Sequence, residues 1–264
     1  GKKWTEIDET KNNSVRHTGE DYIKFENTEV FSESAKHFLK HKTYTFAPPG
    51  TSEYIEFWDE EERRCKEGHT IDGIRITGEH YAYLNYARIL ATVQDGDRQR
   101  KIDTFPKFLD MDYYWYHELE KAERNGEGMI VVKARRKGFS YKNAFGMVWK
   151  YNWFPNSICI LAAFEKTFWA NTMEMAKNMI NFINEHTDWA KGFLVDRQDS
   201  IKSGYIEKDP ISGISIQKGY KSEILALSFK DSPQKSVGRT AERMLFEEAG
   251  DWPGLLQAYQ RSYP

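Results

Sequence analysis

Lys133, Gly138 and Ser140 are spaced like residues that hold a phosphate group. They belong to the stretch MIVVKARRKGFSYKNA, in which an apolar run is followed by a basic loop and then by a helical pattern. A phosphate site needs backbone N–H groups at a helix N-terminus, a cation and, where Mg²⁺ takes part, a hydroxyl group. On the pattern GxxxxGK[ST], Gly138 and Ser140 match, but Phe139 occupies the lysine position and Lys133 that of the first glycine. We therefore predict a deviant phosphate loop in which Lys133 supplies the charge.

Other interpretations of this loop stay open. Lys137, which directly precedes Gly138, is the alternative phosphate-binding lysine. Arg135 and Arg136 could stabilise negative charge in a transition state, although arginines of a basic loop are also found solvated or merely positioning a phosphate. The loop could equally be an ordinary basic turn between a strand and a helix, with Ser140 as the helix N-cap.

A pair of adjacent carboxylates, Glu247 and Glu248, forms the second stretch. They follow the apolar run MLF and precede Ala-Gly. At the end of a strand, a first carboxylate can order the water shell of Mg²⁺ while a second orients an attacking water. Adjacent glutamates also occur at solvated helix starts, where they complement the helix dipole. Because this pair lies downstream of a candidate phosphate loop, we favour the catalytic interpretation.

The elements that would position these residues alternate between strands and helices. Short apolar runs are typical of buried parallel strands, and amphipathic patterns closed by Gly or Pro are typical of helices. The predicted strands span 129–134, 157–163, 223–229 and 243–250, and the predicted helices span 110–126, 140–153 and 164–186. On the last helix, one side is predicted to carry Phe168, Met175, Met179 and Phe182. This order predicts an α/β fold with a mainly parallel sheet covered by helices.

The first hundred residues show a different pattern. They are charged and irregular up to about residue 65, with a Pro-Pro-Gly loop at 45–54 and a short amphipathic helix at 56–68. Residues 71–105 show short strands around one aromatic helix, and the turn at 95–97 predicts a hairpin. We therefore predict an N-terminal α+β appendage, resembling a lid, over residues 1–104 and a core over residues 105–264.

Composition argues against several other classes of protein. The 264 residues carry a formal net charge of −2, so no global positive field marks a nucleic-acid binder. Cys65 and Cys159 lack metal-ligand spacing, which argues against structural zinc and a disulfide framework and favours a reducing, intracellular setting. The seven histidines are scattered, so surface or core roles are expected for them. No apolar run approaches the length of about 18 residues that predicts a membrane span.

The two stretches resemble the ATPase domain of the large terminase subunit of tailed bacteriophages, the motor that packages DNA into an empty capsid. The resemblance is carried by VVKARRKGFSYK, ICILAAFEKTFWANTMEMAKNMI and LALSFKDSPQKSVGRTAERMLFEEAG. In that family the phosphate loop often starts with its lysine, contains an arginine and ends in Gly-aromatic-Ser. The resemblance covers residues 105–250 and implies a P-loop NTPase fold of the ASCE, RecA-like class.

The resemblance also implies a role for each motif residue. Lys133 would hold the β- and γ-phosphates of ATP, and Arg136 would be the catalytic arginine. Ser140 and Glu247 would bind Mg²⁺, and Glu248 would orient the hydrolytic water. The loop that contacts the nucleotide would comprise Lys133, Ala134, Arg135, Arg136, Lys137, Gly138, Phe139 and Ser140.

The implied activity is Mg²⁺-dependent ATP hydrolysis that drives double-stranded viral DNA into the procapsid. The implied partners are this DNA, the portal protein, the small terminase subunit and further copies of the chain in a ring, in the host cytoplasm during virion assembly and without a membrane. The sequence departs from the family in having Glu-Glu where Asp-Glu is commoner, and the chain ends at Pro264. We therefore expect a truncated ATPase core without the C-terminal nuclease domain of the family.

Two alternatives belong to other functional classes. Another P-loop ATPase, or a helicase-like DNA translocase, would bind nucleotide without being a packaging motor. A non-enzymatic module whose basic loop docks on a partner would bind no nucleotide. Nucleotide binding therefore separates the enzymes from the module, and DNA-stimulated hydrolysis separates the translocases from other ATPases.

Overall fold

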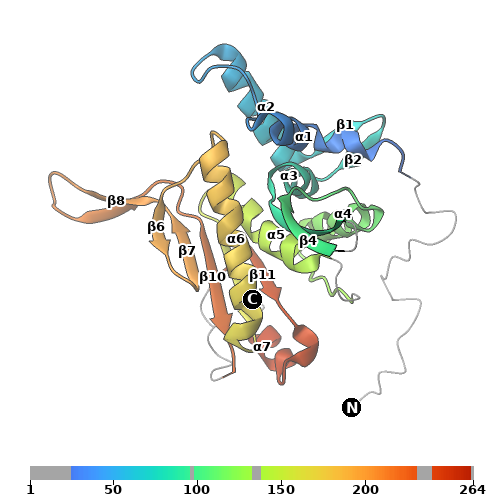
Figure 1. Ribbon diagram of the computed structural model, residues 1–264. Helices are drawn as coiled ribbons and strands as arrows, with labels where there is room; N and C mark the ends of the chain where they lie inside the picture. The colour runs from blue at the N-terminus through green and yellow to red at the C-terminus, as the bar shows by residue number, and fades with distance from the viewer. Residues whose placement is uncertain (1–24, 96–97, 133–137, 231–239, 263–264) are drawn as a thin grey trace.

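A five-stranded sheet lies at the centre of the computed structural model, which describes residues 25–95, 98–132, 138–230 and 240–262 (Figure 1). In their order across the sheet, the strands are β11 (Arg243–Phe246), β5 (Ile158–Ala163), β10 (Glu223–Ser228), β7 (Ser200–Ser203) and β6 (Phe193–Asp196). The predicted strands at 157–163 and 223–229 are thereby confirmed, and the one at 243–250 is confirmed as far as Phe246, since residues 249–251 belong to a 3-10 helix.

The sheet is mixed, which corrects the prediction of a mainly parallel sheet. β11, β5 and β10 run parallel to one another, whereas β7 is antiparallel to β10 and β6 is antiparallel to β7. Phe246 lies beside Ala162, and Ser228 lies beside Ala163. This register brings the carboxyl ends of the three parallel strands to one edge, which is where α/β proteins place their ligands.

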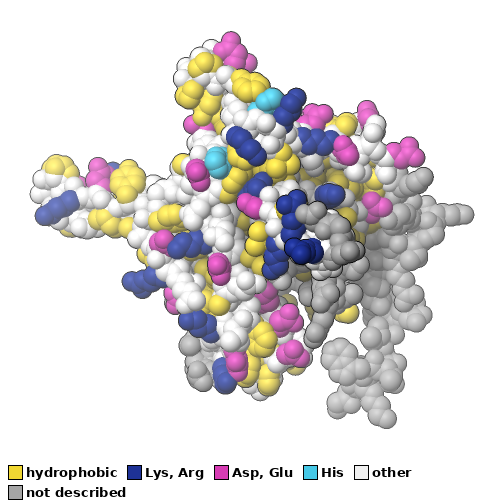
Figure 2. Space-filling view, viewed as in Figure 1, with side chains coloured by type: hydrophobic (Ala, Val, Ile, Leu, Met, Phe, Trp, Pro, Cys, Tyr) yellow, Lys and Arg dark blue, Asp and Glu magenta, His cyan; other side chains and the backbone are white. Residues whose placement is uncertain are grey.

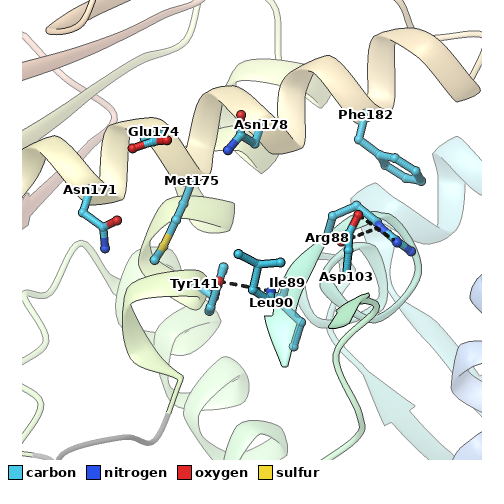
Figure 3. A pocket seen from close by; sticks show the side chains of 10 residues that line it. All are labelled: Arg88, Ile89, Leu90, Asp103, Tyr141, Asn171, Glu174, Met175, Asn178 and Phe182. Carbon is cyan, nitrogen blue, oxygen red and sulfur yellow. Dashed lines mark hydrogen bonds and ion pairs between the residues drawn. The ribbon is translucent and has the colours of Figure 1, made fainter. Parts of the chain in front are cut away.

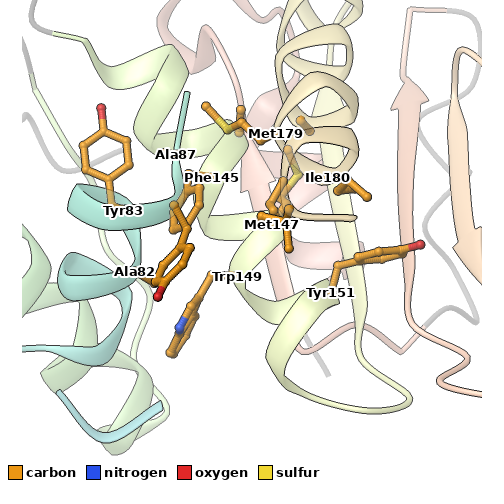
Figure 4. Close-up of a cluster of buried hydrophobic side chains, with 14 of the residues drawn as sticks. Ala82, Tyr83, Ala87, Phe145, Met147, Trp149, Tyr151, Met179 and Ile180 are labelled. Atoms are coloured by element: carbon orange, nitrogen blue, oxygen red, sulfur yellow. The ribbon is translucent and has the colours of Figure 1, made fainter. Parts of the chain in front are cut away.

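Two helices, α5 (Phe139–Trp153) and α6 (Lys166–His186), pack on one face of the sheet, and α3 (Gly78–Tyr86) packs on these two helices. Their buried side chains form the largest hydrophobic cluster of the described residues. Figure 4 shows part of this cluster, with Ala82, Tyr83, Ala87, Phe145, Met147, Trp149, Tyr151, Met179 and Ile180 labelled. α5 is buried on nearly all sides, as expected for a helix with little amphipathic pattern.

α6 confirms the predicted helix at 164–186. Of the four residues predicted to lie on one side of it, Met179 is buried, and Phe168, Met175 and Phe182 are half-buried and pack against the core. The buried residues of the helix are Trp169, Thr172, Met173, Ala176, Met179, Ile180 and Ile183. The half-buried residues therefore flank the core, where they can line a pocket.

The N-terminal part consists of short elements that pack against α3. They are η3 (Thr28–Ser32), α1 (Glu33–His41), α2 (Ser52–Glu67), β1 (His69–Ile71) and β2 (Ile74–Ile76). α2 begins after Thr51, whose hydroxyl accepts the N–H of Tyr54 at 3.3 Å, and Gly68 ends it. The hairpin predicted at 95–97 joins β3 (Ile89–Asp95) and β4 (Arg98–Thr104). Buried residues before and after Thr104 belong to one continuous cluster.

The segment Met129–Val132 corrects the prediction of a buried strand at 129–134. The preceding helix is confirmed as α4 (Asp110–Asn125), closed by Gly126 in the left-handed conformation. Met129–Val132 has no regular structure, and the side chains of Ile130 and Val132 are 94% and 97% exposed. The rest of the predicted strand, Lys133 and Ala134, lies outside the described residues.

Smaller elements cover the opposite face and one end of the sheet. η4 (Ala249–Asp251) and α7 (Leu255–Ser262) contribute Trp252 and Leu255 to a second, smaller cluster on the opposite face. β8 (Tyr205–Lys208) and β9 (Ser215–Lys218) form a separate two-stranded arm between β7 and β10 in the chain. No helix within the described ranges is long and apolar enough to cross a membrane.

A buried ion-pair network ties the sheet to the helices before it. Arg243, at the start of β11, donates to Glu79 of α3 at 2.9 and 2.7 Å and to Glu123 of α4 at 2.8 Å. Burial raises the pKa of Glu79, and the Arg243 charge opposes this rise. Removal of one partner from such a network leaves an uncompensated charge in the interior.

His80 of α3 is a fully buried residue that packs among aromatic side chains of the core. Its ring stacks on Tyr116, with 4.7 Å between the ring centroids, and lies 5.1 Å from the ring of Phe108. Burial lowers the pKa of His80 well below its usual value, because a charged imidazolium is poorly solvated there.

Candidate functional site

The N-terminus of α5 lies where the sequence predicts the end of the phosphate loop. Gly138 precedes the helix in the left-handed conformation, with φ of 72°. Among the described residues, no side chain caps this helix end, and its first turn has no acidic residue. Such an end favours an anion, because its first N–H groups lack intrahelical partners and carry the positive end of the helix dipole. The structure does not support Ser140 as the N-cap, since the helix starts one residue earlier.

The five preceding loop residues cannot be compared with their predicted roles. Lys133, Ala134, Arg135, Arg136 and Lys137 lie outside the described residues. Their placement as phosphate-binding residues, and that of Arg136 as a catalytic residue, therefore stay predictions.

The side chains of Phe139 and Ser140 differ in burial. Ser140 is exposed in the first turn of α5, whereas the Phe139 side chain is buried. The Phe139 ring lies edge-on to Trp115, at 5.6 Å between ring centroids, and 4.0 Å from the ammonium of Lys142. Phe139 could thus reach a nucleotide only through its backbone, while the Ser140 hydroxyl is accessible.

Lys142 lies two residues after Ser140 in the sequence, but its ammonium group already has a carboxylate partner. It forms a buried ion pair with Asp112 of α4. Burial lowers the pKa of Lys142 and raises the pKa of Asp112, and in each case the partner's charge opposes the shift. The pair fixes the first turn of α5 against α4, so Lys142 serves as an anchor of this helix.

Glu247 lies at the carboxyl edge of the sheet, directly after β11. Its N–H donates to the carbonyl of Ala162 at 2.9 Å, which continues the pairing with β5. Its carboxylate accepts the hydroxyl of Thr172 from α6 at 2.9 Å. Glu247 is 9% exposed and Thr172 is buried. A carboxylate in this setting is held in one orientation, since its hydrogen-bond partner sits in a packed helix face.

Glu248 differs from Glu247 in exposure and backbone conformation. It is exposed, and its φ of 49° and ψ of 43° place it in the left-handed region. A residue other than glycine adopts this region at a cost of about 1–2 kcal/mol. Strained residues of this kind cluster at functional sites, because the surrounding structure must hold them there. The chain therefore turns at Glu248, and the two adjacent carboxylates differ in burial: Glu247 is buried and Glu248 is exposed.

A pocket of about 340 Å³ lies between α6, the β3–β4 hairpin and the first turn of α5 (Figure 3). It is lined by Arg88, Ile89, Leu90, Asp103, Tyr141, Asn171, Glu174, Met175, Asn178 and Phe182. Its volume is at the lower end of the range of ligand pockets, which is suited to a small planar group. Met175 and Tyr141 supply apolar surface, and the side-chain amides of Asn171 and Asn178 supply donors and acceptors.

The charges of the pocket do not suit a phosphate group. Asp103 accepts the Nε–H of Arg88 at 3.1 Å, so the only guanidinium in the lining already has a carboxylate partner. This guanidinium also lies 4.6 Å from the ring of Phe105 and 5.2 Å from that of Phe182. Glu174 adds a second carboxylate. A neutral, hydrogen-bonding ligand group fits this lining better than an anion does.

The pocket adjoins both candidate motifs. The Tyr141 hydroxyl accepts the N–H of Leu90 at 3.1 Å, and Tyr141 directly follows Ser140. At the other side, Asn171 directly precedes Thr172, which binds Glu247. The first turn of α5 and the carboxylate after β11 are thus connected through one turn of α6.

The two residues predicted to bind Mg²⁺ offer suitable donor atoms. Ser140 supplies an accessible hydroxyl and Glu247 a carboxylate, and Mg²⁺ prefers oxygen ligands while keeping several waters. Within the described ranges, no group of three or more His, Cys, Asp or Glu side chains is arranged to hold a metal ion. The oxygen donors of these two residues are thus of the chemical type that a hydrated Mg²⁺ takes.

Sequence reasoning missed Thr172, Tyr141 and the pocket residues of α6. Asn171, Glu174, Met175 and Asn178 follow the i, i+3, i+4, i+7 spacing of one helix stripe, so this stripe could have been identified as a polar-apolar face beside the core. The Thr172 contact has no local signal, because Glu247 lies 75 residues away in the sequence.

Comparison with family sequence profiles and with curated protein sequences finds no match. Among solved structures, the chain is similar to a variant of the large terminase ATPase domain of Thermus phage P74-26, with 15% sequence identity and a TM-score of 0.38. The similarity covers 48% of this chain and 53% of that chain. At this level of similarity, the assignment of a function has to rest on the residues themselves.

Proposed function

We propose that the chain is the ATPase domain of a viral DNA-packaging terminase, which couples Mg²⁺-dependent ATP hydrolysis to the translocation of double-stranded DNA into a procapsid. The proposal includes the partners that the sequence resemblance implies: the viral DNA, the portal protein, the small terminase subunit and further copies of the chain in a ring. The setting is the host cytoplasm during virion assembly.

One observation carries the proposal: Glu247 is buried at the carboxyl edge of the sheet and hydrogen-bonded to Thr172 on the helix that also lines the pocket beside α5. A carboxylate at the carboxyl edge of parallel strands and a helix N-terminus that favours an anion are two components that phosphoryl transfer to water uses. The pocket would receive the nucleoside part of ATP, since its lining suits a neutral planar group. The phosphates would then extend toward the predicted loop.

Each site residue has a distinct role in the proposed reaction. Lys133 would neutralise the β- and γ-phosphates, and the first N–H groups of α5 would bind phosphate oxygens. Ser140 and Glu247 would hold Mg²⁺, which when bound supplies charge neutralisation on the phosphates. Glu248 would orient the attacking water, and Arg136 would stabilise the charge that develops on the transferred group.

Binding of a non-hydrolysable ATP analogue, measured by calorimetry with and without Mg²⁺, tests the proposal. The parent should bind in a Mg²⁺-dependent manner, and Lys133→Ala should weaken binding by about tenfold or more, because a charge-assisted phosphate contact is lost. Lys137→Ala is the matched control, since it removes a lysine from the same loop. A folded parent that binds no nucleotide, or equal losses in both variants, would contradict the proposed phosphate loop.

Stimulation of ATP hydrolysis by DNA tests the proposed coupling of hydrolysis to DNA translocation. ATP hydrolysis should rise when double-stranded DNA is added, and Glu248→Gln should abolish hydrolysis while binding of the ATP analogue persists. Nucleotide binding without any effect of DNA would favour another kind of P-loop ATPase.

A further inference from the structure

Two histidines lie one turn apart at the end of α1. His37 and His41 occupy positions i and i+4 of this helix, so their side chains share one helix face. Their ring centroids are 4.7 Å apart, and the rings are tilted by 43° rather than stacked. In the space-filling view, histidine side chains, coloured cyan, reach the surface in the region of α1 and α2 (Figure 2). Neither of these two histidines has a role in the proposed nucleotide site.

The backbone fixes the tautomer of His37. Its Nδ1 lies 2.8 Å from the carbonyl oxygen of Thr43, and because a carbonyl oxygen can only accept, Nδ1 must carry the proton. In the neutral ring, the lone pair then lies on Nε2. Histidines that bind metal ions are oriented in the same way, by donation from the other ring nitrogen to a carbonyl or carboxylate oxygen. His37 is therefore arranged in advance to offer Nε2 as a ligand.

The turn that presents the Thr43 carbonyl is itself anchored. Tyr44 is buried, and its hydroxyl donates to the carbonyl of Asn85 at 2.7 Å. The hydroxyl of Thr43 donates to the carbonyl of Thr45 at 2.8 Å. These contacts hold the backbone on both sides of the Thr43 carbonyl, so the hydrogen bond from His37 meets a fixed acceptor.

The His41 side chain is exposed and can turn toward His37. Neither of its ring nitrogens makes a hydrogen bond to another residue in the described part of the chain. Partial desolvation and then the charges of His37 and Lys40 lower the pKa of His41, which favours the neutral ring with an available lone pair. The ring of Phe46 lies edge-on to both imidazoles, at 5.0 Å from His37 and 4.9 Å from His41 between ring centroids. Phe46 therefore bounds the pair with an apolar surface on one side.

The spacing of the two rings suits a single metal ion. Tetrahedral coordination with metal–nitrogen bonds of about 2.0–2.1 Å puts two ligand nitrogens about 3.3 Å apart. Because the ring centroids are 4.7 Å apart, rotation of the exposed His41 side chain can bring the nitrogens to this separation. Two histidines at i and i+4 of a helix also hold Zn²⁺ in the H-E-x-x-H motif. The pair thus combines the spacing of a metal site with the tautomer that such a site needs.

The surroundings of the pair admit a hydrated cation. The carbonyl groups in the last turn of α1 carry the negative end of the helix dipole, which favours positive charge there. Lys40 and Lys42 are exposed, so water and salt screen their opposing charges. Within the described ranges, no group of three or more His, Cys, Asp or Glu side chains is arranged around a metal ion. Two imidazoles therefore leave the other coordination positions to water, unlike a closed structural zinc site.

We propose that His37 and His41 together bind one hydrated transition-metal ion of the class of Zn²⁺, Ni²⁺ and Cu²⁺. Imidazole nitrogen suits these ions, whereas Mg²⁺ prefers oxygen ligands. The site is therefore distinct from the proposed Mg²⁺ and nucleotide site, and it does not depend on ATP binding. Coordination by both rings bridges the last two turns of α1 and so stabilises the end of this helix.

Calorimetric titration of the untagged chain with Ni²⁺ and with Cu²⁺ tests the site. The parent should bind one ion per chain, Cu²⁺ more tightly than Ni²⁺. His41→Gln should weaken binding at least about tenfold, because one of the two ligands is lost. Since His41 is exposed, this variant should unfold at the same temperature as the parent when no metal is present.

His117→Gln is the matched control for this titration. The Nδ1 of His117 also lies 2.7 Å from a backbone carbonyl, that of Tyr113, but α4 carries no second histidine. The control should therefore bind as the parent does. A parent that binds neither ion, a His41→Gln chain that binds as tightly as the parent, or equal weakening by the control would overturn the proposal.

Electron paramagnetic resonance of the chain with one equivalent of Cu²⁺ tests the ligand set. The parent should show hyperfine coupling to two imidazole nitrogens, and His41→Gln should show coupling to fewer. An excess of Mg²⁺ should leave the spectrum of the parent unchanged, because an oxygen-preferring ion does not compete for imidazole. Unchanged nitrogen coupling in His41→Gln, or displacement of Cu²⁺ by Mg²⁺, would show that the ion is bound elsewhere and would overturn the proposal.

Discussion

Replacement of Thr172 by valine should release the Glu247 carboxylate from α6. The hydroxyl donates to this carboxylate at 2.9 Å, and both side chains are buried. Valine has nearly the same shape but no donor, so the change removes one hydrogen bond to a charged group with little loss of packing. Serine keeps the hydroxyl and removes only a methyl group, which makes Thr172→Ser the matched control.

The expected losses in stability differ in size. A hydrogen bond to a charged partner contributes about 1.5–3 kcal/mol, so Thr172→Val should lower the free energy of unfolding by this amount. Thr172→Ser should lower it by about 1 kcal/mol through the lost methyl group. Urea unfolding of the three proteins measures both values. In nucleotide binding, Thr172→Val should also reduce the gain in affinity that Mg²⁺ provides, whereas Thr172→Ser should retain most of it.

Two results would refute this reasoning. If Thr172→Val unfolds at the same urea concentration as the parent, the hydrogen bond does not hold Glu247. If the valine and serine variants show the same dependence on Mg²⁺, the hydroxyl does not act through the carboxylate. The first result concerns the structure alone and can be obtained even from a chain that binds no nucleotide.

Arg243→Met should lower the free energy of unfolding by about 3–5 kcal/mol, because the buried Glu79 carboxylate loses its cationic partner. Arg124→Met removes an arginine from an exposed ion pair with Glu120 and should lower the free energy of unfolding by less than about 1 kcal/mol. Denaturant unfolding measures the stability of both variants, and equal losses of stability would contradict the buried network around Arg243. Burial raises the pKa of Glu79, so protonation on acidification should shrink the Arg243→Met deficit. Since burial lowers the pKa of His80, the parent should lose stability as the pH falls below the unfolded value of about 6.5. His80→Phe keeps the stacked ring but cannot be protonated, so it should reduce the loss of stability between pH 7 and 5. Thermal unfolding measures this, and an unchanged pH dependence in the variant would argue against a buried neutral imidazole.

Local patterns predicted the elements whose cause is local. Gly126 ends α4, and the apolar runs of β5, β10 and β11 form the parallel strands, because each signal lies within the element itself. The hairpin of β3 and β4 was predicted for the same reason, from the turn between them. The order of strand, helix and strand therefore followed from the sequence.

Pairings between distant segments were not predictable in this way. Met129–Val132 has the composition of a buried strand, but a strand also needs a neighbouring edge, which composition does not report. The antiparallel strands β6 and β7 are short and partly polar, so no apolar run marked them. The sheet was consequently expected to be more parallel than it is.

In the candidate site too, residues with a local sequence signal were predicted and residues that depend on distant contacts were not. Glu247 and Ser140 were identified from motifs, whereas Thr172 and the pocket depend on contacts made by α6. Arg243 looked like an ordinary strand residue, because its partner Glu79 lies 164 residues earlier. Lys142 is the reverse case: it belongs to a basic stretch, yet its side chain lies in the interior against Asp112.

α6 connects the candidate site to the N-terminal part of the molecule. Its 21 residues extend over about 30 Å. Asn171 and Thr172, near its start, lie beside the pocket and Glu247, and Phe182, near its end, lines the same pocket and contacts Phe38 of the N-terminal part. A ligand bound in this pocket would therefore touch α6 both next to the Glu247 contact and next to the N-terminal helices.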